Sequence, residues 1–267
     1  MMKTKYLILV LFVVFIIDAE SFAQNNKYYP ELSKYSHWSI IAGPALYNKA
    51  KLYPEYGEYT FENRPIWSFN AGSEYDFIPD GKWSFTTGII VGYEPVYNIE
   101  YRIKKEDIYS HFTEDCVNET KMYAMPSLSF PLLARLNIQL SKKMFSFFTT
   151  GLRALYFPSG SASLTQVFHN SDQTEAREVF GMRMDSPDNA IQGSFEIGTG
   201  LTFPINKVLL KSSVIYVMNF QNIMEGEYLF DNMFVSPRSY GQYELSGNYL
   251  TVLISASLIK SKRKLNK

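Results

Sequence analysis

The feature that most constrains the fold is a pair of alternating runs between Ile66 and Tyr93. Large apolar side chains take almost every second position of each run, and small or polar side chains take the positions between them. The runs are joined by the segment 78–82, which contains Pro-Asp-Gly. A period of two on both sides of such a turn predicts a β-hairpin with one apolar face. We therefore expect an all-β protein.

The same alternation recurs along the chain and predicts eight strands in total. They span residues 38–47, 66–77, 83–103, 127–139, 145–156, 191–203, 208–219 and 249–259. The connections between them are alternately long and short. This order puts three tight turns at one end and four long, irregular loops at the other. It predicts one antiparallel up-and-down β-barrel domain over residues 24–267.

The first 23 residues have the features of a cleaved signal peptide. Lys3 and Lys5 precede a mostly apolar stretch at residues 6–17, and Ser21 and Ala23 supply the small residues required before cleavage at Gln24. The apolar stretch is too short to span a bilayer as a helix, although an uncleaved anchor is the alternative. After residue 23 the sequence has no apolar run long enough for a membrane helix. An exported chain of this kind enters a membrane only as a closed barrel, because lipid cannot satisfy open strand edges.

Alternation alone does not say whether the apolar faces point outward to lipid or inward to a core. An eight-stranded barrel has room inside for only one layer of side chains, and the apolar faces here are too bulky for it. The opposite faces are rich in Gly, Ser and Thr, which fit. The alternative that escapes this limit is a soluble two-sheet β-sandwich. Aromatic residues at the strand ends, Trp38 and Trp83 at one rim and Trp67 and Tyr93 at the other, match interfacial girdles.

With the apolar faces outward, charged residues fall on the inward faces. They are Glu74, Asp76, Arg135, Arg153, Glu196 and Lys211. We assign Arg153 and Lys211 to the inward faces of their strands because the opposite assignment would place their charges in lipid. Three acids and three bases can compensate one another, and a buried charge is costly unless it is paired. We expect a structural network of ion pairs in the lumen, because an interior of this width is filled; an ion pathway is the alternative.

Together these features resemble the outer-membrane β-barrel family of Gram-negative bacteria, and within it the PorT-like and eight-stranded OmpA-type barrels. The resemblance rests on Ser21-Phe22-Ala23-Gln24, on the hairpin at 67–93 and on Pro131-Leu132-Leu133, and it covers nearly the whole mature chain. It implies a cell outer membrane location, contact with lipid and lipopolysaccharide, and periplasmic N- and C-termini. It also implies a structural, adhesive or assembly role, in some members within secretion machinery.

The chain departs from that family pattern at its C-terminal end. Such barrels usually end on an aromatic residue, whereas here a basic segment, 260–267, follows the last strand. We expect a solvated periplasmic tail; contact with anionic headgroups or with a partner is the alternative.

Aromatic residues crowd the first and fourth long connections and are the main functional lead. They are Tyr53, Tyr56, Tyr59, Phe61, Tyr228, Phe230, Phe234 and Tyr240. Exposed aromatic residues on loops suit partner or ligand binding, while the alternative is a lid over the barrel mouth. We expect a non-enzymatic outer-membrane protein, a structural or accessory subunit of a secretion, uptake or assembly complex with other outer-membrane proteins. A small ligand-binding barrel is a further alternative.

An outer-membrane lipid-modifying enzyme is the main alternative in another class. Acyl transfer needs a nucleophile, a His base and a carboxylate. Two loop clusters supply these residue types, Ser110, His111 and Asp115 in one and His169, Ser171 and Asp172 in the other. Neither matches a recognised catalytic motif, so we expect no enzyme activity.

No cofactor, metal or nucleic-acid partner is expected. The three histidines include no pair at metal-ligand spacing, and Asp185, Asp188 and Asn189 lack the oxygen spacing of a calcium loop. The single cysteine, Cys116, excludes an internal disulfide and is expected to be a loop thiol. The formal net charge of zero gives no electrostatic basis for binding nucleic acid.

Overall fold

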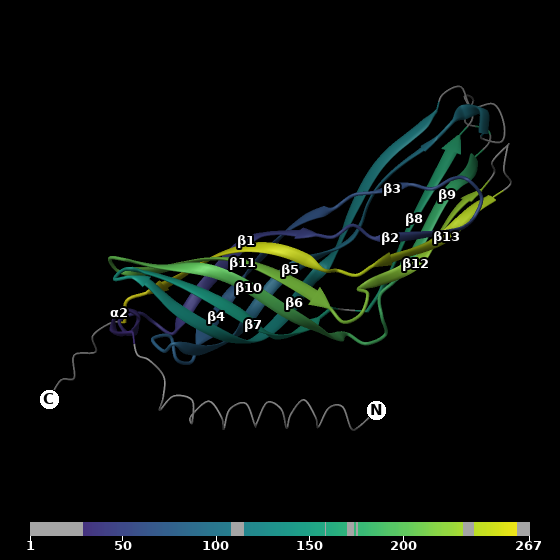
Figure 1. Cartoon of the computed structure of the whole chain (residues 1–267). Helices are drawn as coiled ribbons and strands as arrows, with labels where there is room; N and C mark the ends of the chain where they lie inside the picture. The colour runs from purple at the N-terminus through teal and green to yellow at the C-terminus, as the bar shows by residue number, and fades with distance from the viewer. Residues whose placement is uncertain are drawn as a thin grey trace.

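A closed ring of eight antiparallel strands is the centre of the structure (Figure 1). The computed structural model describes residues 29–107, 115–157, 159–169, 174, 176–231 and 238–260. Around the ring the strands follow the order β4-β1-β14-β11-β10-β7-β6-β5, and β5 pairs with β4 to complete the circle. Each strand therefore lies beside its neighbours in the up-and-down order, and β1 meets β14 at the seam. The prediction of an all-β, eight-stranded, up-and-down barrel is confirmed.

The barrel strands have bounds close to those expected from the alternation. They are β1 (Trp38–Tyr47), β4 (Ile66–Asp76), β5 (Trp83–Ile103), β6 (Cys116–Ser141), β7 (Met144–Tyr156), β10 (Ile191–Ile205), β11 (Val208–Asn219) and β14 (Tyr249–Leu258). The largest difference is at β6, which begins at Cys116 and not at residue 127. Cys116 is thus the first residue of a strand, and its expected place in a loop is wrong. The turn between β10 and β11 needs a left-handed residue, which Asn206 supplies with a φ of 51°.

The long connections are not irregular loops, and that expectation is wrong. Six short strands form within them: β2 (Lys51–Tyr56), β3 (Glu62–Asn63), β8 (Ser161–His169), β9 (Ala176–Asp185), β12 (Met224–Asp231) and β13 (Arg238–Leu245). Five of these form a second sheet in the order β2-β13-β12-β9-β8, and β3 pairs with β5. The far ends of β5 and β6 continue past the barrel as a paired hairpin, with the 3₁₀ turn η1 (Lys105–Asp107) following β5. We call the five-stranded sheet, β3 and this hairpin the distal unit.

The strands of the distal unit together bury an apolar face. Irregular loops, as expected from the sequence, would have left these apolar residues exposed to water. Figure 1 shows it as a continuation of the barrel that leans away from the barrel axis. Aromatic rings fill its core: Tyr101 lies 4.5 Å and Phe230 4.8 Å from Phe180, measured between ring centroids. The buried residues of this core are Ala50, Phe61, Val96, Tyr97, Ile99, Tyr101, Ile103, Leu155, Phe157, Ala162, Val179, Phe180, Met182, Met184, Ile223, Met224, Tyr228, Phe230, Tyr243 and Leu245.

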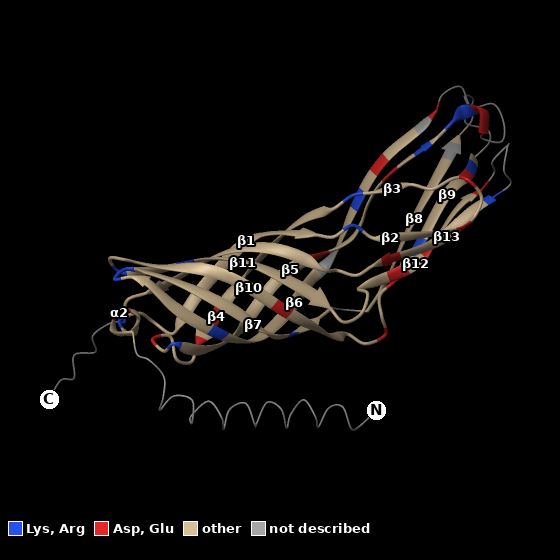
Figure 2. Cartoon of the chain, viewed as in Figure 1, with Lys and Arg blue, Asp and Glu red and all other residues tan. Residues whose placement is uncertain are grey.

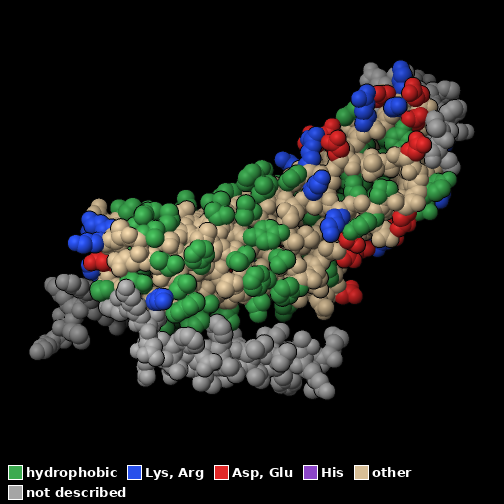
Figure 3. All heavy atoms as spheres, in the orientation of Figure 1, with side chains coloured by type: hydrophobic (Ala, Val, Ile, Leu, Met, Phe, Trp, Pro, Cys, Tyr) green, Lys and Arg blue, Asp and Glu red, His purple; other side chains and the backbone are tan. Residues whose placement is uncertain are grey.

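The wall of the barrel turns bulky apolar side chains outward, as the size argument predicts. Figure 3 shows hydrophobic side chains spread over the visible barrel wall and charged side chains gathered near the turn end and on the distal unit. Figure 2 shows further charged residues along the barrel strands. The exposed apolar residues of the wall include Ile40, Trp67, Phe69, Ile89, Phe130, Phe148, Leu152, Ile197, Val214, Leu250, Val252 and Ile254. An apolar surface of this extent is one that water does not favour.

The segment before β1 covers the turn end of the barrel. The short helix α2 (Pro30–Ser33) places Leu32 in a buried cluster with Tyr29, Tyr35, Phe145 and Leu209. The backbone N–H of Tyr29 donates to the Asp80 carbonyl at 2.6 Å, which ties the segment to the turn after β4. Within the described ranges, no helix has the length and apolar character needed to cross a membrane.

We predict that Phe230→Ala loosens the distal unit while the barrel stays folded. Phe230 is fully buried, and removing a buried Phe side chain costs about 3–5 kcal/mol through lost burial and the cavity left behind. Limited proteolysis should then cut β8, β9, β12 and β13, while the remaining fragment keeps its heat-dependent gel migration. Phe220→Ala, at an exposed phenylalanine, is the control. Equal protease resistance of the two variants would contradict the prediction.

Candidate functional site

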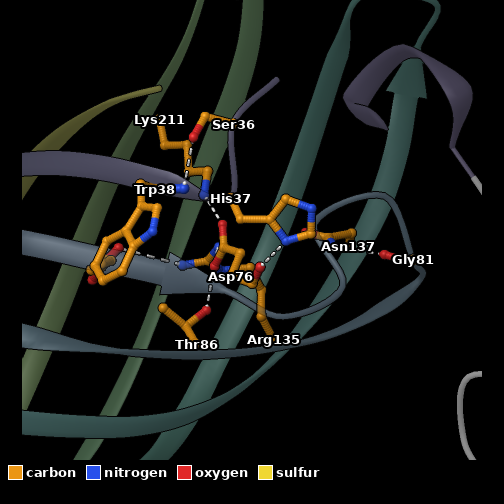
Figure 4. Close-up of polar contacts among 10 residues, drawn as sticks. Ser36, His37, Trp38, Asp76, Gly81, Thr86, Arg135, Asn137 and Lys211 are labelled. Atoms are coloured by element: carbon orange, nitrogen blue, oxygen red, sulfur yellow. Dashed lines mark hydrogen bonds and ion pairs between the residues drawn. The ribbon is translucent and has the colours of Figure 1, made fainter. Parts of the chain in front are cut away.

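Asp76 on β4 is the centre of a charged cluster that crosses the barrel lumen (Figure 4). Its Oδ1 accepts hydrogen bonds from Arg135 Nη1 at 2.8 Å and from Thr86 Oγ1 at 2.6 Å. Its Oδ2 accepts a hydrogen bond from Lys211 Nζ. Arg135 belongs to β6 and Lys211 to β11, so the carboxylate of Asp76 on β4 connects three separate strands of the ring. Separating these buried ion pairs would leave charges unpaired in the lumen, so the pairs hold the three strands together.

The backbone around Asp76 is held in place by two side chains at the turn end. His37 Nδ1 lies 2.8 Å from the Asp76 carbonyl oxygen. Asn137 Nδ2 donates to the Gly81 carbonyl oxygen at 2.8 Å, which fixes the turn that follows β4. Both contacts are drawn in Figure 4. These two contacts fix the end of β4 and so the position of the Asp76 carboxylate.

Arg135 also connects the cluster to its surroundings. Glu74 lies 3.9 Å from Arg135 Nη2, and the guanidinium carbon lies 4.8 Å from the centroid of the Phe147 ring, a cation–π distance. A cavity of about 10 Å³ remains beside Glu74, Arg135 and Lys211. That volume holds at most about one water molecule. The lumen is filled at this level.

A second cluster centres on Arg153 of β7, closer to the distal unit. Its Nη2 lies 2.7 Å from Glu196 Oε2, and its Nε donates to the same oxygen at 2.8 Å. Its Nη1 donates to the Tyr249 hydroxyl at 2.7 Å and to Ser129 Oγ at 3.2 Å. The six residues proposed for a lumenal network are thus all buried and are divided between two clusters.

Glu94 is a lumenal carboxylate that the sequence analysis missed. It lies two residues beyond Gly92 on the inward phase of β5, so the same period of two would have found it. Its Oε1 accepts a hydrogen bond from Ser127 Oγ at 2.7 Å, and its other oxygen lacks a hydrogen-bond partner among the described residues. The interior is also less polar than expected. Buried apolar residues share it with the charges, among them Ile41, Ile90, Leu133, Phe147, Ile215 and Leu253.

The aromatic residues proposed for partner binding separate into four groups. Phe61, Tyr228 and Phe230 are buried in the core of the distal unit, so for them that prediction is wrong. Their rings pack on one another, and each side chain is at most 5% exposed. Phe234 lies outside the described residues. The exposed members are Tyr53, Tyr56 and Tyr240.

Tyr59 is intermediate between the buried and the exposed aromatic residues. Its ring packs beside Phe230, and its hydroxyl donates to the Asp107 carboxylate. Burial and this hydrogen bond raise the pKa of Tyr59 above its ordinary value. The contact ties the first long connection to the far end of the β5–β6 hairpin.

The five-stranded sheet carries a groove that includes two of these aromatic residues, Tyr228 and Tyr240. The groove has a volume of about 500 Å³. It is lined by Glu55, Ser163, Thr165, Glu178, Gly181, Met182, Arg183, Glu227, Tyr228, Leu229, Arg238, Tyr240, Gly241 and Gln242. Its volume lies within the usual range for small-molecule sites, roughly 300–1,000 Å³.

The residues considered for acyl transfer do not form a triad among the described positions. Ser110, His111, Ser171 and Asp172 lie outside the described residues. Asp115 accepts a hydrogen bond from Arg102 Nη2 at 2.8 Å, and this contact lowers the pKa of its carboxyl. His169 is exposed at the end of β8. In the part of the chain that the structure describes, no group of three or more His, Cys, Asp or Glu residues is arranged to hold a metal ion.

Comparisons with known proteins give structural similarity only. No protein-family model matches the chain, and no curated protein matches it. The outer membrane protein OprG from Pseudomonas aeruginosa is 11% identical over 85% of this chain and 98% of its own, with a TM-score of 0.41. The beta domain of the Bordetella autotransporter Brka is 9% identical over 84% of this chain and 98% of its own, with a TM-score of 0.28.

We predict that Asp76→Asn strongly destabilises the barrel. The change leaves Arg135 and Lys211 buried without their shared carboxylate, and breaking a buried pair from one side costs about 3–5 kcal/mol. Urea unfolding of the detergent-folded protein, followed by tryptophan fluorescence, measures the loss. Asp76→Asn combined with Lys211→Met should recover part of it, because one unpaired charge is removed.

The control for this prediction is Glu31→Gln. Glu31 pairs with Lys34 at 3.0 Å, but both side chains are exposed, and exposed pairs contribute little. Its unfolding midpoint should match that of the unchanged protein. An Asp76→Asn midpoint equal to that of Glu31→Gln would show that the lumenal cluster does not brace the barrel.

Proposed function

We propose that this chain is a non-enzymatic integral protein of the cell outer membrane. The observation that carries the proposal is the belt of bulky apolar side chains on the outside of a closed ring. A closed ring satisfies its backbone hydrogen bonds internally, which is what a lipid environment requires of strands. Short turns at one end and an elaborated opposite end match the periplasmic and extracellular sides of such barrels.

The proposed orientation puts the described ends of the chain on the periplasmic side. Tyr35 bridges to Ile259, and Lys260 N–H donates to the Lys34 carbonyl, so both ends lie at the turn end of the barrel. The distal unit then projects outside the cell. Trp67 and Tyr93 fall at the extracellular interface and Trp38 and Trp83 at the periplasmic one.

The proposed barrel serves as an anchor and not as a channel. Cross-lumen clusters at two levels, a cavity with room for about one water, and the cap made by Tyr29, Leu32 and Tyr35 all oppose a water-filled path. The part that meets other molecules is the distal unit. We propose that it makes the chain an accessory subunit of a secretion, uptake or assembly complex.

Membrane insertion makes a specific prediction about one residue on the barrel wall. Val252→Arg places a charge near the middle of the apolar belt, where it should cost about 2–4 kcal/mol against lipid. Val167→Arg is a matched control, because Val167 on β8 is exposed to a similar extent but lies on the distal unit. Folding into phospholipid vesicles, assayed by heat-dependent gel migration, should fail or weaken for Val252→Arg alone. Equal yields of the two variants would contradict the membrane location of the wall.

The complex is tested by cross-linking in intact cells followed by affinity recovery from the membrane fraction and mass spectrometry. We expect specific partners to be recovered with the unchanged protein and lost with Phe230→Ala, in which the distal unit is loosened. Phe220→Ala should retain them. Recovery of the unchanged chain only as a lone monomer would contradict the subunit role and leave the membrane location untouched.

A further inference from the structure

We infer that the turn end of the barrel is a docking surface for the anionic headgroups of phospholipids. The turn end comprises residues 29–37, 77–82, 141–144, 205–208 and 258–260. The inference rests on the proposed function for the membrane position of the barrel and deepens it, because it names the class of lipid that one rim selects. It stands on three observations: an excess of exposed lysines, apolar wall residues beside them, and a compensated charge at the opposite rim.

The first observation is the excess of positive charge at the turn end, where Figure 3 shows basic side chains. Each of the three tight turns contributes at least one exposed lysine, and the segments before β1 and after β14 contribute one each. The six are Lys34, Lys82, Lys142, Lys143, Lys207 and Lys260. The acidic residues of the turn end are Glu31 and Asp80, so four positive charges are in excess. A surface with an excess of one sign attracts ligands of the opposite sign.

Most of these lysines are available to an outside anion. Lys34 is paired with Glu31 at 3.0 Å. Within the described residues, none of the other five lysines has an acidic side chain within ion-pair distance. Two of them start from adjacent backbones: the N–H of Ile259, the residue before Lys260, donates to the Lys207 carbonyl at 2.8 Å. Two flexible ammonium groups are therefore placed side by side at this part of the rim.

The second observation is an exposed apolar residue of the wall beside a lysine of each turn. The pairs are Lys82 with Trp83, Lys142 with Leu140, Lys207 with Ile205 and, after β14, Lys260 with Ile259. A lysine beside an apolar surface lays its methylene stem along that surface and keeps its ammonium group in the polar layer. In the proposed membrane position, lipid surrounds the wall, so the ammonium groups lie at the level of the headgroups.

The third observation is the different arrangement of charge at the opposite rim. Arg64 is the basic residue nearest in the chain to Trp67, and three carboxylates are paired with its guanidinium. Glu119 lies at 3.3 Å and Glu62 at 3.9 Å, and Glu100 accepts a hydrogen bond from it. An anionic headgroup near Trp67 would compete with these carboxylates for the guanidinium. We therefore expect anionic lipid to be selected at the turn end alone.

An acidic protein is the alternative occupant of the turn end, and the packing there disfavours it. Protein interfaces depend on a few apolar or aromatic anchors near their centre. In the segment that covers the turn end, Tyr29, Leu32 and Tyr35 are buried in the barrel's own cluster and are at most 6% exposed. The exposed apolar residues of the turn end belong to the wall, where lipid is the neighbour in the proposed function.

The three tryptophans of the chain allow the two rims to be measured separately. Trp67→Phe leaves Trp38 and Trp83 at the turn end, and the double change Trp38→Phe with Trp83→Phe leaves Trp67 at the opposite rim. Each protein is folded into phosphatidylcholine vesicles that contain either brominated phosphatidylglycerol or brominated phosphatidylcholine. Quenching of tryptophan fluorescence then gives the relative association of the two lipids at each rim.

At low salt we expect phosphatidylglycerol to be preferred about fivefold at Trp38 and Trp83, the effect of about one lysine near an anionic surface. No preference is expected at Trp67. The preference at the turn end should be lost at about 1 M salt, where charges more than about 3 Å apart are screened from one another.

Two sets of substitutions, both made in the Trp67→Phe protein, test the lysines directly. The turn variant combines Lys82→Gln, Lys142→Gln, Lys143→Gln and Lys207→Gln. The matched control removes four exposed lysines from the distal side of the barrel through Lys49→Gln, Lys51→Gln, Lys104→Gln and Lys105→Gln. Both variants lose the same amount of positive charge, and heat-dependent gel migration verifies that both are folded. The preference for phosphatidylglycerol should disappear in the turn variant and remain in the control.

Three outcomes overturn the inference: equal association of the two lipids at Trp38 and Trp83, an equal preference at Trp67, or a preference that the turn variant retains. Strong but equal quenching by both brominated lipids would contradict the lysine surface and leave the membrane location intact. Absence of quenching by either lipid would contradict the membrane location, and the inference with it. Failure of the inference is therefore distinguishable from failure of the proposed function.

Discussion

The width of an eight-stranded ring is the constraint on which the rest of this structure depends. A ring of this size holds one layer of side chains, so bulky residues must lie outside and whatever lies inside must fit and be neutralised. The outward residues then form an apolar belt. The inward charges lie close together in the narrow lumen and must be paired, because an unpaired buried charge is costly. Asp76 accordingly accepts hydrogen bonds from both Arg135 and Lys211.

The barrel could be predicted from the sequence because its signal does not depend on distant context. Each wall strand alternates large and small residues, so β5 and β11 have the bounds read from the pattern, Trp83–Ile103 and Val208–Asn219. Four of the inward charges, Glu74, Asp76, Arg135 and Glu196, follow from the same alternation. Glu94 keeps the same alternation, but it lies beyond Tyr93, where the regular apolar pattern of β5 ends.

The distal unit could not be predicted, because its strand pairing is irregular and joins segments far apart in the sequence. Its strands are short and contain irregularities, such as the shift between Gln166 and Val167, which breaks the period of two. Whether a tyrosine is buried depends on a partner strand far away in the sequence: β2 lies beside β13, almost at the other end of the chain. Tyr228 and Tyr240 look alike in sequence, yet one fills a core and the other faces solvent. Composition alone does not separate them.

The continuation of β5 and β6 from the barrel into the distal unit has a mechanical consequence. β6 has 26 residues, a length of roughly 85 Å at about 3.3 Å per residue, whereas a membrane crossing takes about 9–11 residues. The two strands remain paired as they leave the barrel, with register shifts on both sides of Pro95, so paired strands join the distal unit to the ring. A force applied to the distal end of this hairpin is therefore transmitted to the barrel strands. In the proposed orientation, the length of these paired strands sets the distance of the distal unit from the bilayer.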